Sequence, residues 1–287
     1  MNKNLTFLSL VTMFILGLMA SNACYAKPME TAMPTHRVMD KPFEFREISL
    51  SFVKNPQGQY LGRISDLVFD SHGHITFAIL SRPGAIGIPG RPLAVPFSAL
   101  VFNDKDKVFD LNVNWEKLES AAVFSRGDLD NRKWVEDTYR YFGQQPYWTE
   151  EGYKKEKNAA MVREEAMPVT HGWSRPHEVT EILGDRVMNP QGKNLGRIND
   201  LVFDREGRVS FVVLGYGGFL RIGEKLVAIP FGALSYQENE KHLVLDITPE
   251  RLDAAPVFNR KTLGDLQWAD EVYRYFGQQP YWTEPKK

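Results

Sequence analysis

The sequence predicts a mainly β fold of two small antiparallel β-barrels, each followed by a short C-terminal helix and an aromatic tail. First, residues 43–150 align without a gap on residues 177–284, and 49 of these 108 pairs are identical. A repeat of this length is the size of a domain. Second, turn signals recur at short intervals within each copy, which favours an antiparallel barrel or sandwich over a parallel sheet. Third, each copy ends in a short pattern of helical period that runs into aromatic residues.

The first 26 residues have the parts of a secretory signal. Lys3 precedes an apolar run from Leu5 to Ala20, and small residues lead to an expected cleavage site after Ala26. The apolar run is marginal in length for a membrane span. We therefore expect a periplasmic or secreted protein, with two alternatives left open: lipidation at Cys24 and an uncleaved anchor. Membrane contact is expected only if this segment is retained or lipidated.

The cysteine count and the net charge exclude several classes of function. Cys24 is the only cysteine and lies in the signal, so the mature chain has no thiol for a disulfide, a nucleophile or a thiolate metal site. Removal of Lys3 with the signal leaves 34 basic and 36 acidic residues, a net charge of −2. No basic block stands out, so neither nucleic acid nor an anionic membrane surface is an expected partner.

The strand region of each copy is divided by strong turn signals, after a proline-containing lead-in at 27–42 that is predicted to be flexible. The turn at 55–58 has proline second and glycine fourth, as a β-turn favours. The turn at 70–73 starts with an aspartate that can bond the backbone. The predicted strands, rich in Val, Ile, Leu and Phe, are 61–70, 74–80, 93–100 and 108–113 in the first copy and 195–204, 208–214, 227–234 and 242–247 in the second.

A short helix is expected at the end of each copy. Trp134, Thr138, Tyr141 and Phe142 fall on one helical face, and Gly143 suits a left-handed stop. The second copy repeats this pattern from 268 to 277. Residues 151–176 are predicted to link the units 43–150 and 177–287. The first half of this linker is highly charged, as a solvated helix would be, and its second half is expected to be extended.

Each copy also carries the motif of a known family. In the first copy it comprises Gly58, residues 61–64 (Leu-Gly-Arg-Ile), residues 66–70 (Asp-Leu-Val-Phe-Asp), Gly73 and residues 94–100 (Ala-Val-Pro-Phe-Ser-Ala-Leu), and the second copy repeats it in register. On these residues each repeat resembles the PRC-barrel family. The resemblance implies a highly bent antiparallel sheet closed into a partial barrel. It also implies a docking or assembly role, as in the soluble domain of the photosynthetic reaction centre H subunit and one domain of a ribosome maturation factor. It implies no catalytic residues, and the export signal argues against a ribosomal role.

Two aspartate pairs are the first candidates for chemistry: Asp66 with Asp70, and Asp200 with Asp204. The members of each pair lie four apart on a strand and so share a face, which leaves a metal or acid–base site as one interpretation. We favour structural roles, because Asp70 and Asp204 stand at turn positions. Asp66 and Asp200 alternate with apolar residues, as half-buried carboxylates bonded to main chain would. The glycines of these turns and strands are also predicted to be structural: Gly58, Gly62, Gly73, Gly192, Gly196 and Gly207.

The other motifs give weaker evidence for a functional site. His72 and His74 have no third ligand nearby and no histidine at the matching positions of the second copy. The glycines from 215 to 218 lack the lysine and serine or threonine of a phosphate loop. No hydrolase signature occurs. We therefore expect no catalytic residues, no metal and no cofactor, and a protein that is not an enzyme.

The aromatic tails are the best functional candidates. Their residues have the composition of an interface hot spot: Tyr139, Tyr141, Phe142, Tyr147 and Trp148 in the first copy, and Tyr273, Tyr275, Phe276, Tyr281 and Trp282 in the second. Aromatic side chains also seal small barrels well, since each buries a large apolar area and keeps a polar tip. Packing and partner binding are both left open, and they can coexist on opposite faces of one helix.

The functional expectation is a non-catalytic exported binding or assembly module. A barrel of five or six strands is filled by its own side chains, so binding is expected on external barrel faces and on the aromatic tails. The expected partner is another envelope protein, with pairing of the repeats about a pseudo-twofold axis and a homo-oligomer left open. One alternative is an envelope enzyme with a cleft between the domains that collects charged residues such as Asp66 or Arg63. The other is a membrane-tethered assembly factor that keeps its N-terminal anchor.

Overall fold

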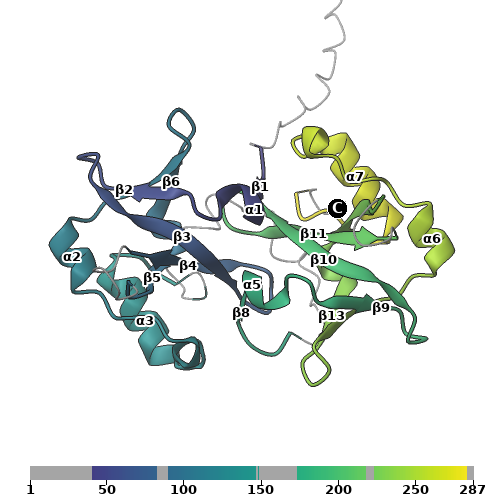
Figure 1. Cartoon of the computed structure of the whole chain (residues 1–287), viewed down its shortest axis with the longest axis horizontal. Coiled ribbons are helices and arrows are strands. Elements are labelled where there is room, and N and C mark those ends of the chain that lie inside the picture. Colours follow the sequence, from purple (N-terminus) through teal and green to yellow (C-terminus); the bar gives the residue numbers. More distant parts are fainter. Residues whose placement is uncertain (1–40, 83–89, 147, 149–172, 218–222, 283–287) are drawn as a thin grey trace, which may run out of the picture. The chain divides into compact units, whose positions relative to one another are not determined.

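The computed structural model describes residues 41–82, 90–146, 148, 173–217 and 223–282, and the two repeats build the same series of elements (Figure 1). The first repeat contains β1 (Phe43–Glu44), α1 (Phe45–Ile48), β2 (Phe52–Lys54), β3 (Tyr60–Phe69), β4 (Ile75–Ser81), β5 (Leu93–Pro96), η1 (Phe97–Ala99), β6 (Leu100–Asn103), β7 (Val108–Leu111), α2 (Trp115–Glu119), η2 (Arg126–Asp130) and α3 (Arg132–Tyr141). The second contains β8 (His177–Glu178), α5 (Val179–Ile182), β9 (Arg186–Met188), β10 (Asn194–Phe203), β11 (Val209–Tyr216), β12 (Lys225–Pro230), η4 (Phe231–Ala233), β13 (Leu234–Gln237), β14 (His242–Leu245), α6 (Pro249–Asp253), η5 (Arg260–Thr262) and α7 (Leu266–Tyr275).

Each repeat forms a curled half-barrel sheet, so the mainly β fold predicted from the sequence is confirmed. The strand order is β5-β4-β3-β2-β7-β6 in one sheet and β12-β11-β10-β9-β14-β13 in the other. Register shifts after Ile64 and Val68 mark bulges in β3, which help a long strand to bend. The sheets are not wholly antiparallel, because β2 pairs with β7 and β9 with β14 in parallel.

The predicted strand at 93–100 is divided into two strands. Strand β5 ends at Pro96, and β6 begins at Leu100 after the 3₁₀ turn η1. Proline has no N–H to continue the ladder, which agrees with the break at this position. The predicted strand at 227–234 is divided in the same way between β12 and β13, and the remaining predicted strands are present with shifts of one or two residues at their ends.

The two repeats exchange their first strands. Strand β1 of the first repeat pairs with β10 of the second, with Phe43 opposite Phe203. Strand β8 of the second repeat pairs with β3 of the first, with His177 opposite Phe69. Each sheet therefore has seven strands, one of which comes from the other repeat. This reciprocal exchange is a pseudo-twofold arrangement, in which neither sheet is complete without the other repeat.

The turns after β3 and β10 meet at the centre of this arrangement. The amide of Ile75 donates to the carbonyl of Gly207 at 2.6 Å, and the amide of Val209 donates to that of Gly73 at 2.7 Å. Gly73 has φ +79°, and a Cβ built on it would lie 2.8 Å from the ring of Phe231 in the other repeat. Glycine is therefore required here both for the turn and for the close approach of the two repeats.

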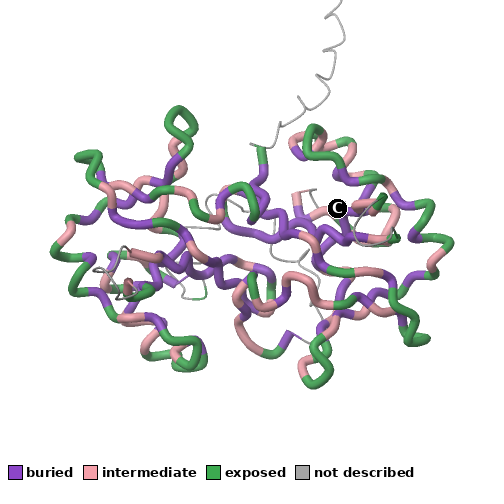
Figure 2. The backbone as a smooth tube through the Cα atoms, viewed as in Figure 1, coloured by how far each residue is buried: buried purple, intermediate pink, exposed green. Residues whose placement is uncertain are grey.

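The buried residues, whose positions along the chain are purple in Figure 2, form one shared core and two smaller cores. The shared core contains residues of both repeats. One smaller core lies between the outer face of the first sheet and α3, and the other between the second sheet and α7. The long strands are thus covered on both faces, which explains why the last residues of β3 are all buried rather than alternating.

The helices at the repeat ends are present, with a different buried face from the predicted one. Helix α3 ends where expected, and Gly143 has φ +72°. Its buried side chains are Val135, Thr138 and Tyr139, while Trp134 and Tyr141 are only half-buried. In the described part of the chain, no helix is both long enough and apolar enough to cross a membrane.

Candidate functional site

The first tyrosine of each aromatic tail is a packing residue. Tyr139 and Tyr273 are both buried, and their hydroxyls donate to the carbonyls of Thr76 and Ser210 at 3.0 Å. Each ring also contacts a phenylalanine of the sheet below it. Phe142 is buried as well, and Phe276 is half-buried against the shared core. These side chains fit the packing interpretation of the tails.

The end of the second tail is held by polar contacts as well as by packing. Tyr281 is buried, and its hydroxyl donates to the Asp204 carboxylate at 2.9 Å and lies 2.9 Å from the hydroxyl of Ser210. Burial raises the pKa of Tyr281 well above its ordinary value. The half-buried indole of Trp282 donates from Nε1 to Asp270 at 2.8 Å. The end of the second tail thus packs onto the smaller core of its own repeat.

The remaining tail residues are more accessible. Tyr141 and Tyr275 are half-buried, and their hydroxyls donate to the carbonyls of Lys117 and Arg251. Trp148 is 37% exposed, which makes it the most exposed tail residue among those described. Tyr147 lies outside the described residues. The surface that the tails offer to a partner is therefore confined to a few side chains.

The outer aspartates organise turns. Asp70 accepts hydrogen bonds from the amides of His72 and His74, both at 2.9 Å. Asp204 accepts from the amide of Arg208 at 2.8 Å. This is the geometry of the backbone-bonding turn that the sequence predicts for both positions.

The inner aspartates connect the two repeats. Asp66 accepts from the amide of Thr180 at 3.2 Å and from its hydroxyl, so that the carboxylate meets the first turn of α5. Asp200 does the same for α1 through the amide of Arg46 at 3.2 Å. Burial raises both carboxyl pKa values, that of Asp200 to about 6. Sequence spacing predicts the strand face of these residues but not their partners, which lie 114 and 154 positions away.

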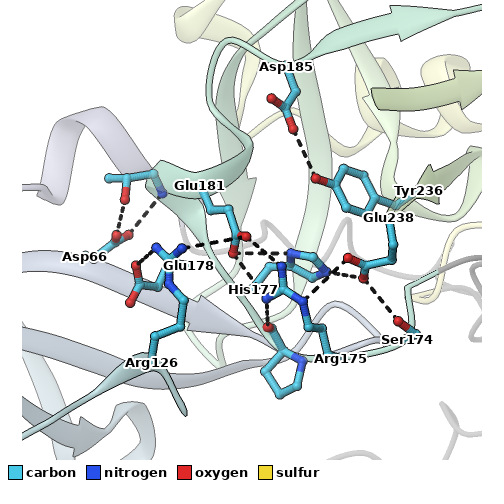
Figure 3. A network of polar contacts seen from close by, with 12 residues as sticks. Asp66, Arg126, Ser174, Arg175, His177, Glu178, Glu181, Asp185, Tyr236 and Glu238 are labelled. Atoms are coloured by element: carbon cyan, nitrogen blue, oxygen red, sulfur yellow. Dashed lines mark hydrogen bonds and ion pairs between the residues drawn. The ribbon is translucent and has the colours of Figure 1, made fainter. Parts of the chain in front are cut away.

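A polar cluster surrounds the exchanged strand β8 (Figure 3). The His177 side chain is fully buried, with Nε2 2.9 Å from Glu238 and Nδ1 3.5 Å from Glu181. Arg175 pairs with both glutamates, at 2.6 Å and 3.5 Å. The indole of Trp173 stacks on Tyr236 with ring centroids 4.8 Å apart.

The charges of this cluster compensate one another. Burial lowers the pKa of His177, and the positive charge of Arg175 lowers it further. The two glutamates oppose that shift, and the Arg175 guanidinium holds the pKa of Glu181 below its ordinary value. Within the described ranges, no group of three His, Cys, Asp or Glu side chains has the geometry to hold a metal ion. The arrangement fits an adhesive role, fixing the segment before α5 onto the end of β13 in the same repeat.

A shallow groove lies on the outer surface of the first repeat. It is lined by Phe52, Tyr60, Arg63, Ser81 and Arg82, and we call it the repeat-1 groove. Phe52 on β2 stands opposite Arg63 on β3, which stands opposite Ser81 on β4, so the groove crosses three paired strands. The rings of Phe52 and Tyr60 meet edge to face at 5.5 Å.

Both arginines of the groove lie on aromatic rings. The guanidinium carbon of Arg63 is 4.5 Å from the centre of the Phe52 ring. That of Arg82 is 4.1 Å from the Trp115 ring. Aromatic residues and arginine are the side chains most enriched at binding hot spots.

The second repeat does not reproduce this groove. The positions that match its lining hold Arg186, Asn194, Arg197, Gly215 and Tyr216. Arg197 donates to the carbonyl of Gly184 at 2.7 Å instead of stacking on a ring. The Glu224 carboxylate lies against Gly215, at the place that corresponds to one wall of the groove.

Exposed apolar side chains are also concentrated in the first repeat. Among the described residues the large ones are Leu50, Phe52, Val101 and Trp148 in the first repeat and Val257 in the second. The positions matching the first three hold Gly184, Arg186 and Ser235. The identical tails do not predict this surface, because its signal lies in positions where the copies differ.

Comparison with known proteins identifies the family. The model of the PRC-barrel domain matches twice, at residues 53–118 and 177–252. No curated protein matches the chain. The two matches cover the strand regions and end before α3 and α7, so the exchanged strand β1 and both aromatic tails lie outside them. The chain is a tandem PRC-barrel protein.

Proposed function

We propose that this chain is a non-catalytic binding or assembly module of the bacterial envelope, exported by residues 1–26, that binds a partner protein through the outer face of its first repeat. The repeat-1 groove and the exposed apolar side chains of the same repeat carry the proposal. The second repeat is then the rigid support of the first, since each sheet is completed by the other repeat.

The asymmetry of the surface is the strongest support. Leu50 is 63% exposed, and its backbone has φ +70°, a conformation that costs a non-glycine residue about 1–2 kcal/mol. The matching position in the second repeat is Gly184, which adopts φ +87° without that cost. An exposed leucine in a strained turn, next to an exposed phenylalanine, does not serve the fold. A contact made outside the chain explains both side chains.

The buried carboxylates between the repeats, Asp66 and Asp200, support an enzyme less well. Asp66 and Asp200 have raised pKa values, as a buried catalytic acid would. Both carboxylates, however, accept hydrogen bonds from the first turn of an exchanged helix. A group that holds the two repeats together in this way is poorly placed to exchange protons with a substrate.

Site-specific crosslinking tests the proposal. A photoreactive phenylalanine at position 52 is expected to capture a discrete envelope protein in cells, and the same residue at position 186, its match in the second repeat, is expected to capture none. The double variant Leu50→Gly with Val101→Ser should weaken the capture at position 52. Equal capture from both positions, or capture that the double variant does not change, would contradict a site on the first repeat.

A further inference from the structure

We infer that the repeat-1 groove binds a carboxylate-bearing polypeptide segment, with Arg63 and Arg82 binding the carboxylates and Phe52 and Tyr60 packing on the apolar residues between them. This inference rests on the proposed function, because it names the chemistry of the partner at the same surface.

The first argument is that the two guanidinium groups have no ion-pair or hydrogen-bond partner among the described residues. Within the described part of the chain, most arginines near an acidic residue are paired with it, as Arg126 is with Glu178 and Arg260 with Glu44. Neither the Arg63 nor the Arg82 guanidinium makes an ion pair or hydrogen bond there, and no acidic residue lines the groove. Stacking on a ring uses a face of a guanidinium and not its edge, and the edge matches a carboxylate through two parallel hydrogen bonds. Nε of Arg82 is buried without a hydrogen-bond partner in the described ranges.

The second argument is that the arginines are held in place. A Cβ built on Gly62 would lie 3.6 Å from Cγ of Arg82, so the arginine stem crosses β3 where glycine has no side chain. The guanidinium of Arg63 rests on the Phe52 ring at 4.5 Å. Side chains held before binding lose less conformational freedom when a ligand arrives.

The third argument comes from the second repeat, where the protein places its own carboxylate at this site. Glu224 lies against Gly215, the match of Ser81. The residue that matches Glu224 in the first repeat is Gly90, so no side chain of that position fills the groove. A carboxylate thus occupies this position in one copy, and the other copy leaves it for a carboxylate from outside the chain.

A peptide carboxylate suits the groove better than a lone anion. The two guanidinium groups stack on different rings, and Phe52 is 42% exposed beside them. Binding to the whole groove therefore requires apolar contacts together with negative charge, which alternating acidic and aromatic residues supply.

The test uses the full chain and three probes. These are the peptide acetyl-Phe-Glu-Phe-Asp-Phe-amide, its counterpart with Gln and Asn in place of Glu and Asp, and inorganic phosphate. Binding is followed by NMR through the side-chain Nε–H signals of arginine. The acidic peptide is expected to shift the signals of Arg63 and Arg82 with an affinity at least tenfold above that of the amide peptide. Equal affinity for the amide peptide, equal affinity for phosphate, or no binding by the acidic peptide would each overturn the inference.

Two sets of variants sharpen the result. Arg63→Gln with Arg82→Gln should weaken binding of the acidic peptide at least tenfold, whereas the matched change Arg186→Gln with Arg197→Gln in the second repeat should leave it within twofold. Gly90→Glu gives the first repeat the carboxylate of the second and should also weaken binding at least tenfold. If position 52 still crosslinks to a partner while the acidic peptide fails to bind, the proposed function stands and this inference falls. If both experiments fail, both fall.

Discussion

The two repeats share a scaffold and differ in two surfaces built on it. Positions 61–70 and 195–204, which form most of β3 and β10, differ at a single residue. The outer groove, by contrast, holds different side chains at four of its five matching positions, and the exchanged segments 43–48 and 177–182 differ at three of six. The identical parts are those that bend the sheets and bring the repeats together. The comparison therefore separates what this fold needs from what each copy has acquired for another purpose.

The exchanged segments show the same difference inside the molecule. Around β1 the contact is largely aromatic, with Phe43 edge-on to Phe102 at 4.8 Å and Arg205 binding Asp104 through two hydrogen bonds of 2.8 Å. Around β8 the matching positions hold His177, Tyr236 and Glu238, and the contact is polar and titratable. The same strand exchange is thus held by mainly aromatic contacts around β1 and by polar, titratable side chains around β8.

The central glycines provide the largest expected effect. Gly73→Ala should lower the free energy of unfolding by about 3 kcal/mol, because the backbone at φ +79° disfavours alanine and the new methyl group meets Phe231 of the other repeat. Gly58→Ala is the matched control: it has φ +77° but open space around it, and should cost about 1 kcal/mol. Urea denaturation measures both. Equal costs would mean that the contact between the repeats at Gly73 contributes nothing.

The second prediction concerns pH, and it depends on a position where the repeats differ. His74 stands opposite Arg208 at the central contact and lies 3.9 Å from Asp70. Burial, together with the charges of Arg208 and His72, lowers the pKa of His74 to about 3. The unfolded chain binds a proton at this histidine near pH 6.5 and the folded chain does not. The contribution of neutral His74 to stability is therefore present above pH 6.5 and lost as the pH falls toward 3.

A His74→Gln variant isolates this effect. Asp200 acts in the opposite direction, since its pKa of about 6 means that the folded state takes up a proton before the unfolded state does. The wild-type curve sums these two groups with other shifted ones, among them Asp66 and His177, so the difference between the proteins is the useful quantity. Between pH 7 and pH 4 the wild type should lose about 2–3 kcal/mol more stability than the variant. Parallel stability curves would show that His74 is not a buried neutral group.

The sequence predicted the elements well because they depend on local chemistry. The turn at 70–73 requires an aspartate and, three residues later, a glycine, and the structure has both in these roles. Strands β3 and β10 follow from runs of β-branched and apolar residues. The family motif in each copy then added the bend of the sheet, which the family match confirms.

The exchange of strands and the groove could not be predicted from the sequence, and the reasons are physical. Strand β1 has two residues, too few for any periodicity, and Phe43 pairs with Phe203, 160 positions away. The groove depends on which of two exposed surfaces is left open, and Glu224 closes only one of them. The identity of the two tails suggested a binding surface, but it has another cause. Tyr139, Tyr273 and Tyr281 are buried, so their identity reflects the same packing in both copies.

The tails allow a smaller comparison between the repeats. Trp282→Ala should lower the free energy of unfolding by about 2 kcal/mol, because the indole is half-buried and its loss leaves Asp270 without this donor. Trp148→Ala removes a more exposed ring and should cost less than about 1 kcal/mol. Thermal unfolding of the two variants is the measurement. A larger cost at Trp148 would make it a packing residue and remove it from the accessible surface of the first repeat.

The smallest effect is the sharpest test of why the first repeat exposes Leu50. Leu50→Gly relieves a left-handed backbone strain of about 1 kcal/mol, and the greater freedom of glycine in the unfolded chain offsets about the same amount. Because Leu50 is 63% exposed, little packing is lost, and stability should change by less than about 0.5 kcal/mol. The reverse change, Gly184→Leu, places a leucine at φ +87° in the second repeat and should cost about 1 kcal/mol. If Leu50→Gly instead destabilises the chain by more than about 1 kcal/mol, the leucine serves the fold. If stability is unchanged while crosslinking at position 52 weakens, its role is to meet another molecule.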